Sequence, residues 1–151
     1  MTTRFLVDTD VLSGGAPSKA RSTAPLSEWM DRNSERLYVS VVTIAEIEDG
    51  IAKSAREGAM AMRKAARLRE WLETLVHLYS PRILPFDLAA ARLAGTLSEG
   101  ARADGHMAAF ADLAIGAIAR CHSLTVLTRN LSHYAPLGVA AHDPVAELPS
   151  D

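Results

Sequence analysis

Three acidic residues that lie far apart in the sequence stand out for their surroundings. Asp8 follows the apolar run Phe5-Leu6-Val7, Glu46 lies just beyond a valine-rich run, and Asp112 interrupts the apolar residues of 108–115. A carboxylate among apolar residues is costly to bury unless a cation or several hydrogen-bond donors meet it. Carboxylates that are packed together also repel, and a hard divalent cation removes that conflict. We therefore predict that Asp8, Glu46 and Asp112 bind Mg²⁺, for which Mn²⁺ is able to substitute.

Zinc is excluded by the types and spacing of the available residues. The chain has one cysteine and five histidines, and the histidines lack the spacing of metal ligands on a common helix. These histidines are His77, His106, His122, His133 and His142. The predicted site is therefore built from oxygen ligands.

The elements that must position the three acids alternate between short apolar runs and longer helical patterns. Strands are expected at residues 4–8, 37–42, 82–85 and 124–128, with a last short strand that includes Val139 and Ala140. Helices are expected at residues 26–33, 60–78, 87–97 and 107–120, with another that starts at Thr43 and a loop at 100–105. Strands separated by helices imply right-handed crossovers and a parallel sheet covered on both faces. We predict a three-layer α/β/α sandwich with a central parallel sheet, formed as a single domain by residues 1–151.

A parallel sheet would bring the acids to one place. Asp8 closes the first strand, and Glu46 lies in the first turn of the helix that leaves the second. The helix of Asp112 precedes the fourth strand and runs antiparallel to it. Its start therefore faces the same carboxyl edge, where Thr128 and Asn130 leave the fourth strand. Because open α/β sheets bind ligands at that edge, the sequence predicts one acidic pocket there.

Two of these acids also have a purely structural interpretation. Asp8 is suited to be a turn residue or the N-cap of the turn that follows the strand. Glu46 lies three residues after Thr43, which is the spacing of a capping box. Asp112 is harder to explain in this way, because its neighbours are apolar.

Composition places the chain among globular proteins, which we expect to be cytoplasmic. It has 151 residues, of which 48% are hydrophobic and 23% charged, and a formal net charge of −2. Residues 1–10 do not have the pattern of a signal peptide, and the most apolar segment, 107–119, is too short for a membrane helix. Cys121 cannot form an internal disulfide and is expected to be a small core residue.

Basic residues are concentrated in one stretch of this near-neutral chain. Residues 53–69 contain six basic residues and a single acid, Glu57. Such a strip is either a phosphate-binding surface or a solvated helix face. The basic residues are Lys53, Arg56, Arg63, Lys64, Arg67 and Arg69, called the basic strip below.

Five ordered blocks carry a resemblance to a known family. They read LVDTDVLS at 6–13, VSVVTIAEI at 39–47, RILPFD at 82–87, ADLAI at 111–115 and LTRN at 127–130. With these blocks the chain resembles PIN-domain ribonucleases, specifically VapC-type toxins of bacterial toxin–antitoxin modules in the FitB-like branch. The resemblance spans some 130 residues and implies a PIN-like fold.

The same resemblance implies roles for particular residues and partners. Asp8, Glu46 and Asp112 would bind the metal, and Thr128 and Asn130 would support the site by hydrogen bonding. The implied activity is endoribonuclease cleavage of a structured RNA such as tRNA, which inhibits translation. The implied assembly is a homodimer, neutralised by a cognate VapB-type antitoxin whose C-terminal segment enters the acidic groove.

The sequence departs from the family pattern at two positions. Members often carry a fourth acid shortly after the fourth strand, where this chain has His133. Because hard cations prefer oxygen to a neutral imidazole, this leaves open whether one or two ions bind. Asp10 stands where the family commonly has asparagine, two residues from Asp8.

The chemistry expected of such a site is metal-assisted hydrolysis of a phosphodiester, which leaves a 5′-phosphate and a 3′-hydroxyl. Glu46 would orient or deprotonate the attacking water. Arg129 and the basic strip would bind RNA phosphates, so affinity should fall with salt.

Two other functions remain open on sequence alone. Asp8-Thr9-Asp10 after a strand resembles the start of haloacid dehalogenase-type phosphatases, in which the first aspartate is a nucleophile. Leu12 at the position of the usual hydroxyl residue, and the absence of a later acidic pair, argue against it. A nuclease-inactive PIN domain that binds RNA or protein is the second alternative, and His133 supports it.

Overall fold

The computed structural model describes residues 2–17 and 24–151 of the chain, and its centre is a sheet of five short parallel strands. The strands are β1 (Phe5–Val7), β2 (Leu37–Ser40), β3 (Ile83–Leu84), β4 (Thr125–Leu127) and β5 (Ala141–His142). Their order across the sheet is β3-β2-β1-β4-β5, and every neighbouring pair is parallel. The central β1 pairs with β2 on one side and with β4 on the other.

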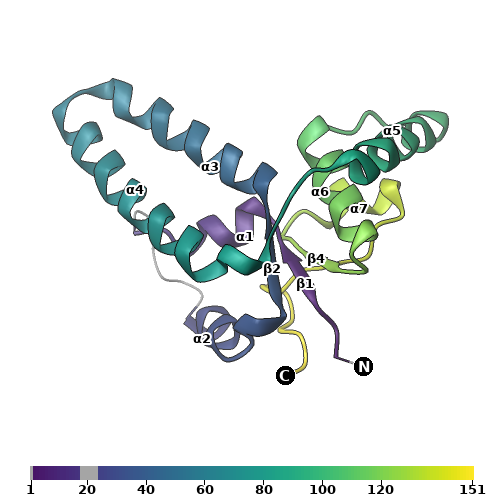
Figure 1. Cartoon of the computed structure of the whole chain (residues 1–151), viewed down its shortest axis with the longest axis horizontal. Helices are drawn as coiled ribbons and strands as arrows, with labels where there is room; N and C mark the ends of the chain where they lie inside the picture. Colours follow the sequence, from purple (N-terminus) through teal and green to yellow (C-terminus); the bar gives the residue numbers. More distant parts are fainter. Residues whose placement is uncertain (1, 18–23) are drawn as a thin grey trace.

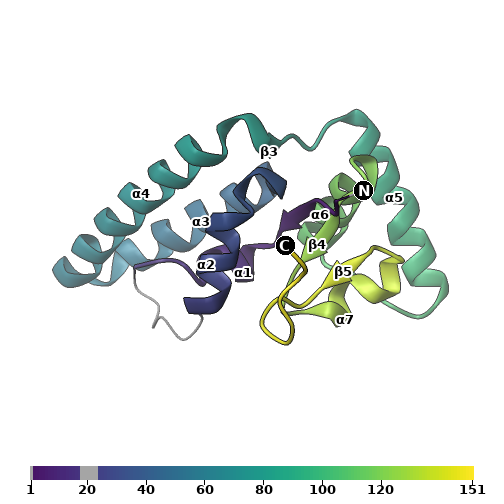
Figure 2. The ribbon, with the colours of Figure 1, turned by 90° about the horizontal axis from the view of Figure 1, so that it is seen from below.

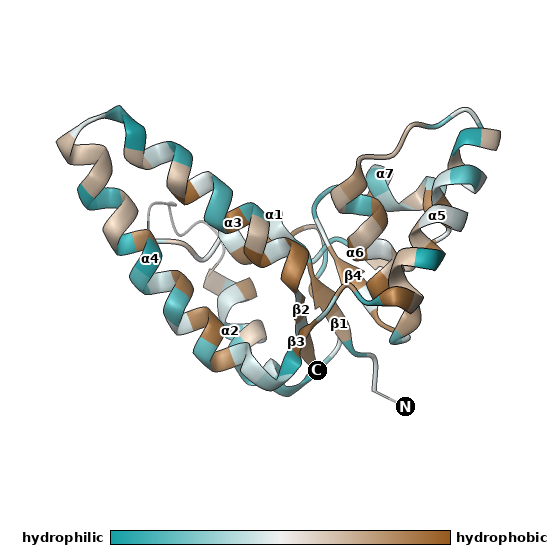
Figure 3. Ribbon diagram, turned by 45° about the horizontal axis from the view of Figure 1, so that its top comes forward, coloured by the Kyte–Doolittle hydropathy of each residue, from teal (hydrophilic) through white to brown (hydrophobic). Residues whose placement is uncertain are grey.

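Successive residues of β1 pack on opposite faces of the sheet, because side chains alternate along a strand. Leu6 belongs to a hydrophobic cluster with two helices of the second half of the chain, whereas Phe5 and Val7 belong to a cluster with helices of the first half. All three are buried. Figure 3 shows this as hydrophobic colour concentrated on the strands and on the helix surfaces that meet them. The predicted three-layer α/β/α fold with a central parallel sheet is confirmed.

The first half of the chain covers one face of the sheet with four helices. They are α1 (Thr9–Ser13), α2 (Ala24–Arg32), α3 (Val41–Ser54) and α4 (Ala59–Tyr79). Figure 1 shows α3 and α4 as a long hairpin that projects away from the sheet. Buried residues of α3 and α4, including Ile47, Ile51 and Leu72, pack with Trp29 of α2.

The second half covers the other face with α5 (Leu88–Ala103), α6 (Phe110–Cys121) and the short α7 (Leu131–Tyr134). Figure 2 shows α6 next to β4, α5 farther to the right, and β5 and α7 below β4. Almost the whole of α6 between Leu113 and Ala119 is buried, because this helix lies between the sheet and α5. Asp87 is the predicted N-cap of α5, and its carboxylate accepts a hydrogen bond from the backbone N–H of Ala90 at 3.0 Å.

The start of α3 and the end of α5 differ from the prediction. Helix α3 begins at Val41, not Thr43, because Ser40 caps it by accepting a hydrogen bond from Val42 N–H at 2.9 Å. The predicted capping box of Thr43 and Glu46 is therefore wrong. Helix α5 runs on to Ala103, through most of the predicted loop at 100–105, because Ala101 is buried in the core.

The last strand and the cysteine also differ from expectation. Strand β5 is Ala141–His142 rather than residues 139–140, since Val139 packs into the core before the strand begins. Cys121 is exposed at the end of α6, so its prediction as a core residue is wrong. Within residues 2–17 and 24–151, no helix combines the length and the apolar character needed to cross a bilayer.

Candidate active site

Asp8 lies at the carboxyl end of β1, and its carboxylate accepts hydrogen bonds from residues that follow β1 and β4. It is 6% exposed and caps α1, where its Oδ1 accepts a hydrogen bond from Thr9 N–H at 2.8 Å. Its Oδ2 accepts a second bond, at 2.8 Å, from the hydroxyl of Thr128, which is completely buried just after β4. The N–H of Asn130 donates to the same hydroxyl at 3.0 Å. The N-cap interpretation of Asp8 is correct, and its carboxylate is also fixed by the loop after β4.

Asp10 is fixed by the same loop but through only one of its oxygens. Its Oδ2 accepts hydrogen bonds from Arg129 N–H at 2.9 Å and from the Asn130 side-chain amide at 3.2 Å. Its Oδ1 is buried and has no hydrogen-bond partner among the described residues. Burial and the charge of Asp8 raise the pKa of Asp10, against the lowering effect of the hydrogen bond from Arg129 N–H.

Glu46 reaches the site through Thr9 rather than directly. The Thr9 hydroxyl donates to Glu46 Oε1 at 2.6 Å and lies 3.1 Å from the hydroxyl of the fully buried Thr43. Glu46 itself is exposed, one and a half turns into α3. This contact joins α1 to α3 and sets the carboxylate of Glu46 beside the start of α1.

Asp112 lies in the first turn of α6, as predicted, and is half-buried. Its Oδ2 is 3.2 Å from Nδ1 of His133, which is exposed on α7. Burial raises the pKa of Asp112, and the charge of Asp8 adds to the effect while His133 opposes it. The residue at the position of the missing fourth acid therefore contacts Asp112 with a nitrogen.

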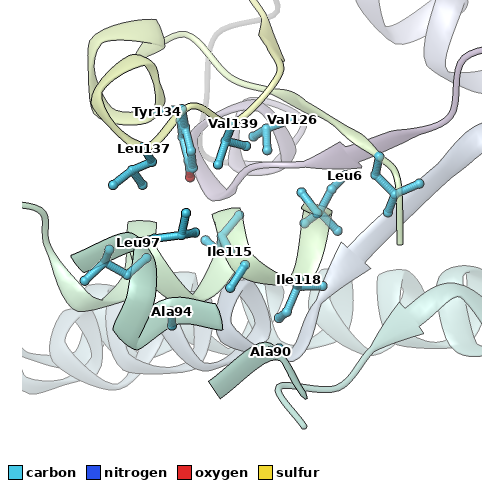
Figure 4. Close-up of a cluster of buried hydrophobic side chains, with 14 of the residues drawn as sticks. Leu6, Ala90, Ala94, Leu97, Ile115, Ile118, Val126, Tyr134, Leu137 and Val139 are labelled. Atoms are coloured by element: carbon cyan, nitrogen blue, oxygen red, sulfur yellow. The ribbon is translucent and has the colours of Figure 1, made fainter. Parts of the chain in front are cut away.

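Tyr134, on α7 directly after His133, brings a buried hydroxyl to this part of the molecule. Its ring is completely buried, and its hydroxyl has no hydrogen-bond partner among the described residues. Burial raises the pKa of the phenol first, and the negative charges of Asp8, Asp112 and Asp10 raise it further. Tyr134 lies within reach of Asp8 and Asp112, and its contact with Asp112 lowers the pKa of that carboxyl. Figure 4 shows the ring among core residues, with its oxygen directed toward α6.

Gly116 permits the close packing of Val139 over α6. A Cβ at this position would lie only 3.1 Å from the Val139 side chain, whereas its 3.8 Å distance to the Tyr134 ring would be an ordinary contact. Beside the site, between the start of α6 and α7, a hollow of about 250 Å³ is lined by Asp112 and His133 among others. Asp112 is therefore accessible from this hollow.

The donor chemistry of the site fits a hard divalent cation. Oxygen ligands predominate, the buried Oδ1 of Asp10 has no donor among the described residues, and burial together with the charge of Asp8 raises the pKa values of Asp10 and Asp112. Within residues 2–17 and 24–151, however, no three His, Cys, Asp or Glu side chains are arranged as a ready metal-binding group. The metal-binding roles of Asp8, Glu46 and Asp112 stay predictions.

The basic strip lies on the hairpin of α3 and α4, around the turn that is remote from the sheet in Figure 1. Two of its residues are paired: Lys53 with Asp49 at 2.8 Å and Arg69 with Glu48 at 3.5 Å. Arg129 is exposed next to Thr128, at the site itself. The strip is thus separate from the carboxylates, whereas Arg129 adjoins them.

Comparison with known proteins identifies the class. The model of the PIN domain family matches residues 5–135, and the chain belongs to this family. Among curated proteins it is similar to Toxin FitB of Neisseria gonorrhoeae, with 33% identity over 93% of this chain and 97% of that protein. It is also similar to VapC ribonuclease Y4jK of Sinorhizobium fredii, with 30% identity over 93% of this chain and 96% of that protein.

The solved structures give the same answer for the fold. The crystal structure of FitAcB from Neisseria gonorrhoeae superposes with a TM-score of 0.79 at 33% identity, covering 93% of this chain and 98% of that one. The predicted likeness to the VapC and FitB group is confirmed. The phosphatase suggested by Asp8-Thr9-Asp10 is set aside, because the PIN match accounts for the same residues.

Sequence reasoning missed two residues of the site. Thr9 lies between the two aspartates of the DTD segment, but the sequence does not reveal its contact with Glu46, because that contact depends on how α1 meets α3. Tyr134 follows His133 directly, and nothing in its sequence context distinguishes a buried hydroxyl beneath a site from an ordinary core aromatic residue.

Proposed function

We propose that this protein is a Mg²⁺-dependent endoribonuclease toxin of a type II toxin–antitoxin system. The observation that carries the proposal is that one loop, at 128–130, holds the carboxylates of Asp8 and Asp10 at the carboxyl edge of the sheet, while the buried Oδ1 of Asp10 meets no donor among the described residues. Membership of the PIN family and similarity to a VapC ribonuclease and to Toxin FitB support it.

The side chains divide the work according to their positions. Asp8 and Asp112 hold the cation, and Thr128 and Asn130 keep Asp8 in place from the loop after β4. When bound, Mg²⁺ offsets the negative charge of the scissile phosphate and makes water more acidic, and Mn²⁺ would serve in the same way. Glu46 is exposed and oriented by Thr9, so it is available to orient the attacking water or accept its proton. In-line attack then leaves a 5′-phosphate and a 3′-hydroxyl.

The substrate that we propose is a structured RNA such as tRNA, whose cleavage inhibits translation in the cytoplasm. Arg129 adjoins the carboxylates and would bind a phosphate near the cut. The basic strip on the hairpin of α3 and α4 would contact phosphates farther along a substrate long enough to reach it. A folded RNA meets this requirement better than a short single strand.

The proposed protein partners are a cognate VapB-type antitoxin and a second copy of this chain. A pocket with several carboxylates and a buried oxygen without a donor favours an inserted arginine or lysine, which would neutralise the charge. An antitoxin segment of this chemistry would compete with the divalent cation and the RNA. Homodimerisation is proposed from family resemblance.

The proposal is tested by incubating the purified protein with bulk tRNA in Mg²⁺ and in excess EDTA. We expect discrete fragments with 5′-phosphate ends in Mg²⁺ and none in EDTA. Asp112→Asn is expected to abolish cleavage while the protein stays folded, whereas Asp104→Asn, at an exposed position past the end of α5, is expected to retain it. Cleavage in EDTA, or full activity of Asp112→Asn, would contradict the proposed chemistry.

One observation favours a second candidate, a nuclease-inactive PIN domain that binds RNA or protein. His133 contacts Asp112 at 3.2 Å and in its protonated form would occupy the carboxylate as an internal cation. The two candidates differ in their response to Mg²⁺. A ligand present at 100 times its Kd stabilises the folded state by about 2.7 kcal/mol. For the nuclease we therefore expect the melting temperature to rise with Mg²⁺, and for the binding module we expect no change.

A further inference from the structure

The two oxygens of Asp10 have opposite environments. Oδ2 accepts two hydrogen bonds from the loop after β4, one from Arg129 N–H at 2.9 Å and one from the Asn130 amide at 3.2 Å. Oδ1 is buried and meets no donor among the described residues. A buried carboxylate oxygen without a donor or cation costs free energy. The loop therefore fixes the orientation of a carboxylate that still lacks a partner on its other side.

That free oxygen lies in the same cluster as the predicted metal-binding acids. The loop at 128–130 clamps both aspartates of α1, Asp8 through the Thr128 hydroxyl and Asp10 through Arg129 and Asn130. The loop thus orients the Asp8 and Asp10 carboxylates as one unit at the carboxyl edge of the sheet.

Tyr134 is an independent sign that this unit accommodates a further group. Its side chain is 0% exposed, its hydroxyl is without a hydrogen-bond partner in the described part of the chain, and Asp8, Asp112 and Asp10 all act on it. Its oxygen is directed toward α6, the helix that carries Asp112 (Figure 4), so that a buried polar group without a partner among the described residues faces the carboxylates.

We propose that Asp10 supplies the fourth carboxylate of the site, with its Oδ1 as a ligand of the divalent cation, in place of the acid that His133 replaces. The inference rests on the proposed metal-dependent function and names one more ligand for it. His133 then acts as a hydrogen-bonding partner of Asp112, whose Oδ2 lies 3.2 Å from its Nδ1, and does not bind Mg²⁺. The gain of an acid at position 10 and its loss at position 133 keep the number of carboxylates at four.

The experiment is a calorimetric titration of the full chain with MnCl₂, repeated with MgCl₂, and needs no RNA. The variants are Asp10→Asn, His133→Asp and the double variant, with Asp104→Asn as a control that changes the same net charge at an exposed position. Asparagine at position 10 can still accept the two hydrogen bonds of the loop at 128–130, so that it removes mainly the charge and the free oxygen.

We expect Asp10→Asn to weaken Mn²⁺ binding at least tenfold and Asp104→Asn to leave it within twofold. Adding His133→Asp to Asp10→Asn should recover most of the loss, because it returns the fourth carboxylate from the other side of the site. Melting in EDTA should show Asp10→Asn at least as stable as the parent, since the charge of a half-buried carboxylate close to Asp8 is removed.

The outcomes separate this inference from the proposed function. If the parent binds Mn²⁺ and Asp10→Asn binds it equally well, Asp10 is not a ligand, and the nuclease proposal stands without it. If Asp10→Asn melts at a lower temperature in EDTA, Asp10 is a structural residue and the inference is overturned. If the parent binds neither ion, the inference and the metal-dependent function both fail.

Discussion

Thr128→Val should weaken the fold by an amount that follows from two hydrogen bonds. The hydroxyl donates to Asp8 Oδ2 at 2.8 Å and accepts from Asn130 N–H at 3.0 Å, at a position that is completely buried. Valine keeps the shape of the side chain but removes both bonds. A bond to a charged group contributes about 1.5–3 kcal/mol and an ordinary one about 1 kcal/mol, so the expected loss is about 2–4 kcal/mol.

The assay is thermal unfolding in EDTA, where metal binding does not contribute. For a chain of this length 1 kcal/mol corresponds to about 2–4 °C, so that the melting temperature should fall by about 4–16 °C. Thr125→Val is the matched control. It changes a partly exposed threonine on β4 that has no side-chain hydrogen bond to any described residue, and should alter stability by about 0.5 kcal/mol or less.

A Thr128→Val variant that melts within about 1 °C of the parent would refute this reasoning. It would mean that the Asp8 carboxylate is satisfied by other groups and that the loop at 128–130 does not hold it. The roles assigned to Thr128 and Asn130 would then have to be abandoned.

Two further predictions concern pH and the scaffold. The pKa values of Asp10 and Asp112 are raised above 3.8 in the fold, so the metal-free folded state retains protons that the unfolded chain releases. The contribution of these two groups to stability should therefore fall as pH rises through their pKa values, which melts from pH 4 to 8 would show. Saturating Mg²⁺ should remove this fall. Asp87→Ala removes the N-cap of α5 and should lower the free energy of unfolding by about 1 kcal/mol, measured in denaturant, without changing the affinity for Mn²⁺. A loss of Mn²⁺ affinity of about 1 kcal/mol would contradict this prediction, because it would mean that α5 supports the metal site.

The central sheet could be predicted because its signals are local. β1, β2 and β4 are short apolar runs whose side chains are buried on both faces, and such runs separated by helices fix a parallel arrangement. From that arrangement alone, Asp8 and Thr128 were expected at one edge of the sheet, and they are hydrogen-bonded to each other. The position of Asp112 near the start of its helix, on the same edge, followed from the direction of that helix.

The contacts within the site could not be predicted in the same way, because they depend on helix position to within a residue. The start of α3 moved by two residues since Ser40, not Thr43, caps it. This shift frees Glu46 from the expected capping box, and its carboxylate then meets Thr9. The short α7 likewise decides that His133 reaches Asp112 while Tyr134 is turned into the core.

The central claim is that carboxylates from separate parts of the chain share one divalent cation at the carboxyl edge of the sheet. The most direct measurement is anomalous diffraction at the manganese edge from crystals grown with Mn²⁺. We predict a single strong peak bound by oxygens of Asp8 and Asp112. The claim would be contradicted if manganese is found only elsewhere on the molecule. In that case the Asp8 and Asp112 carboxylates would lie far from each other and contact protein groups alone.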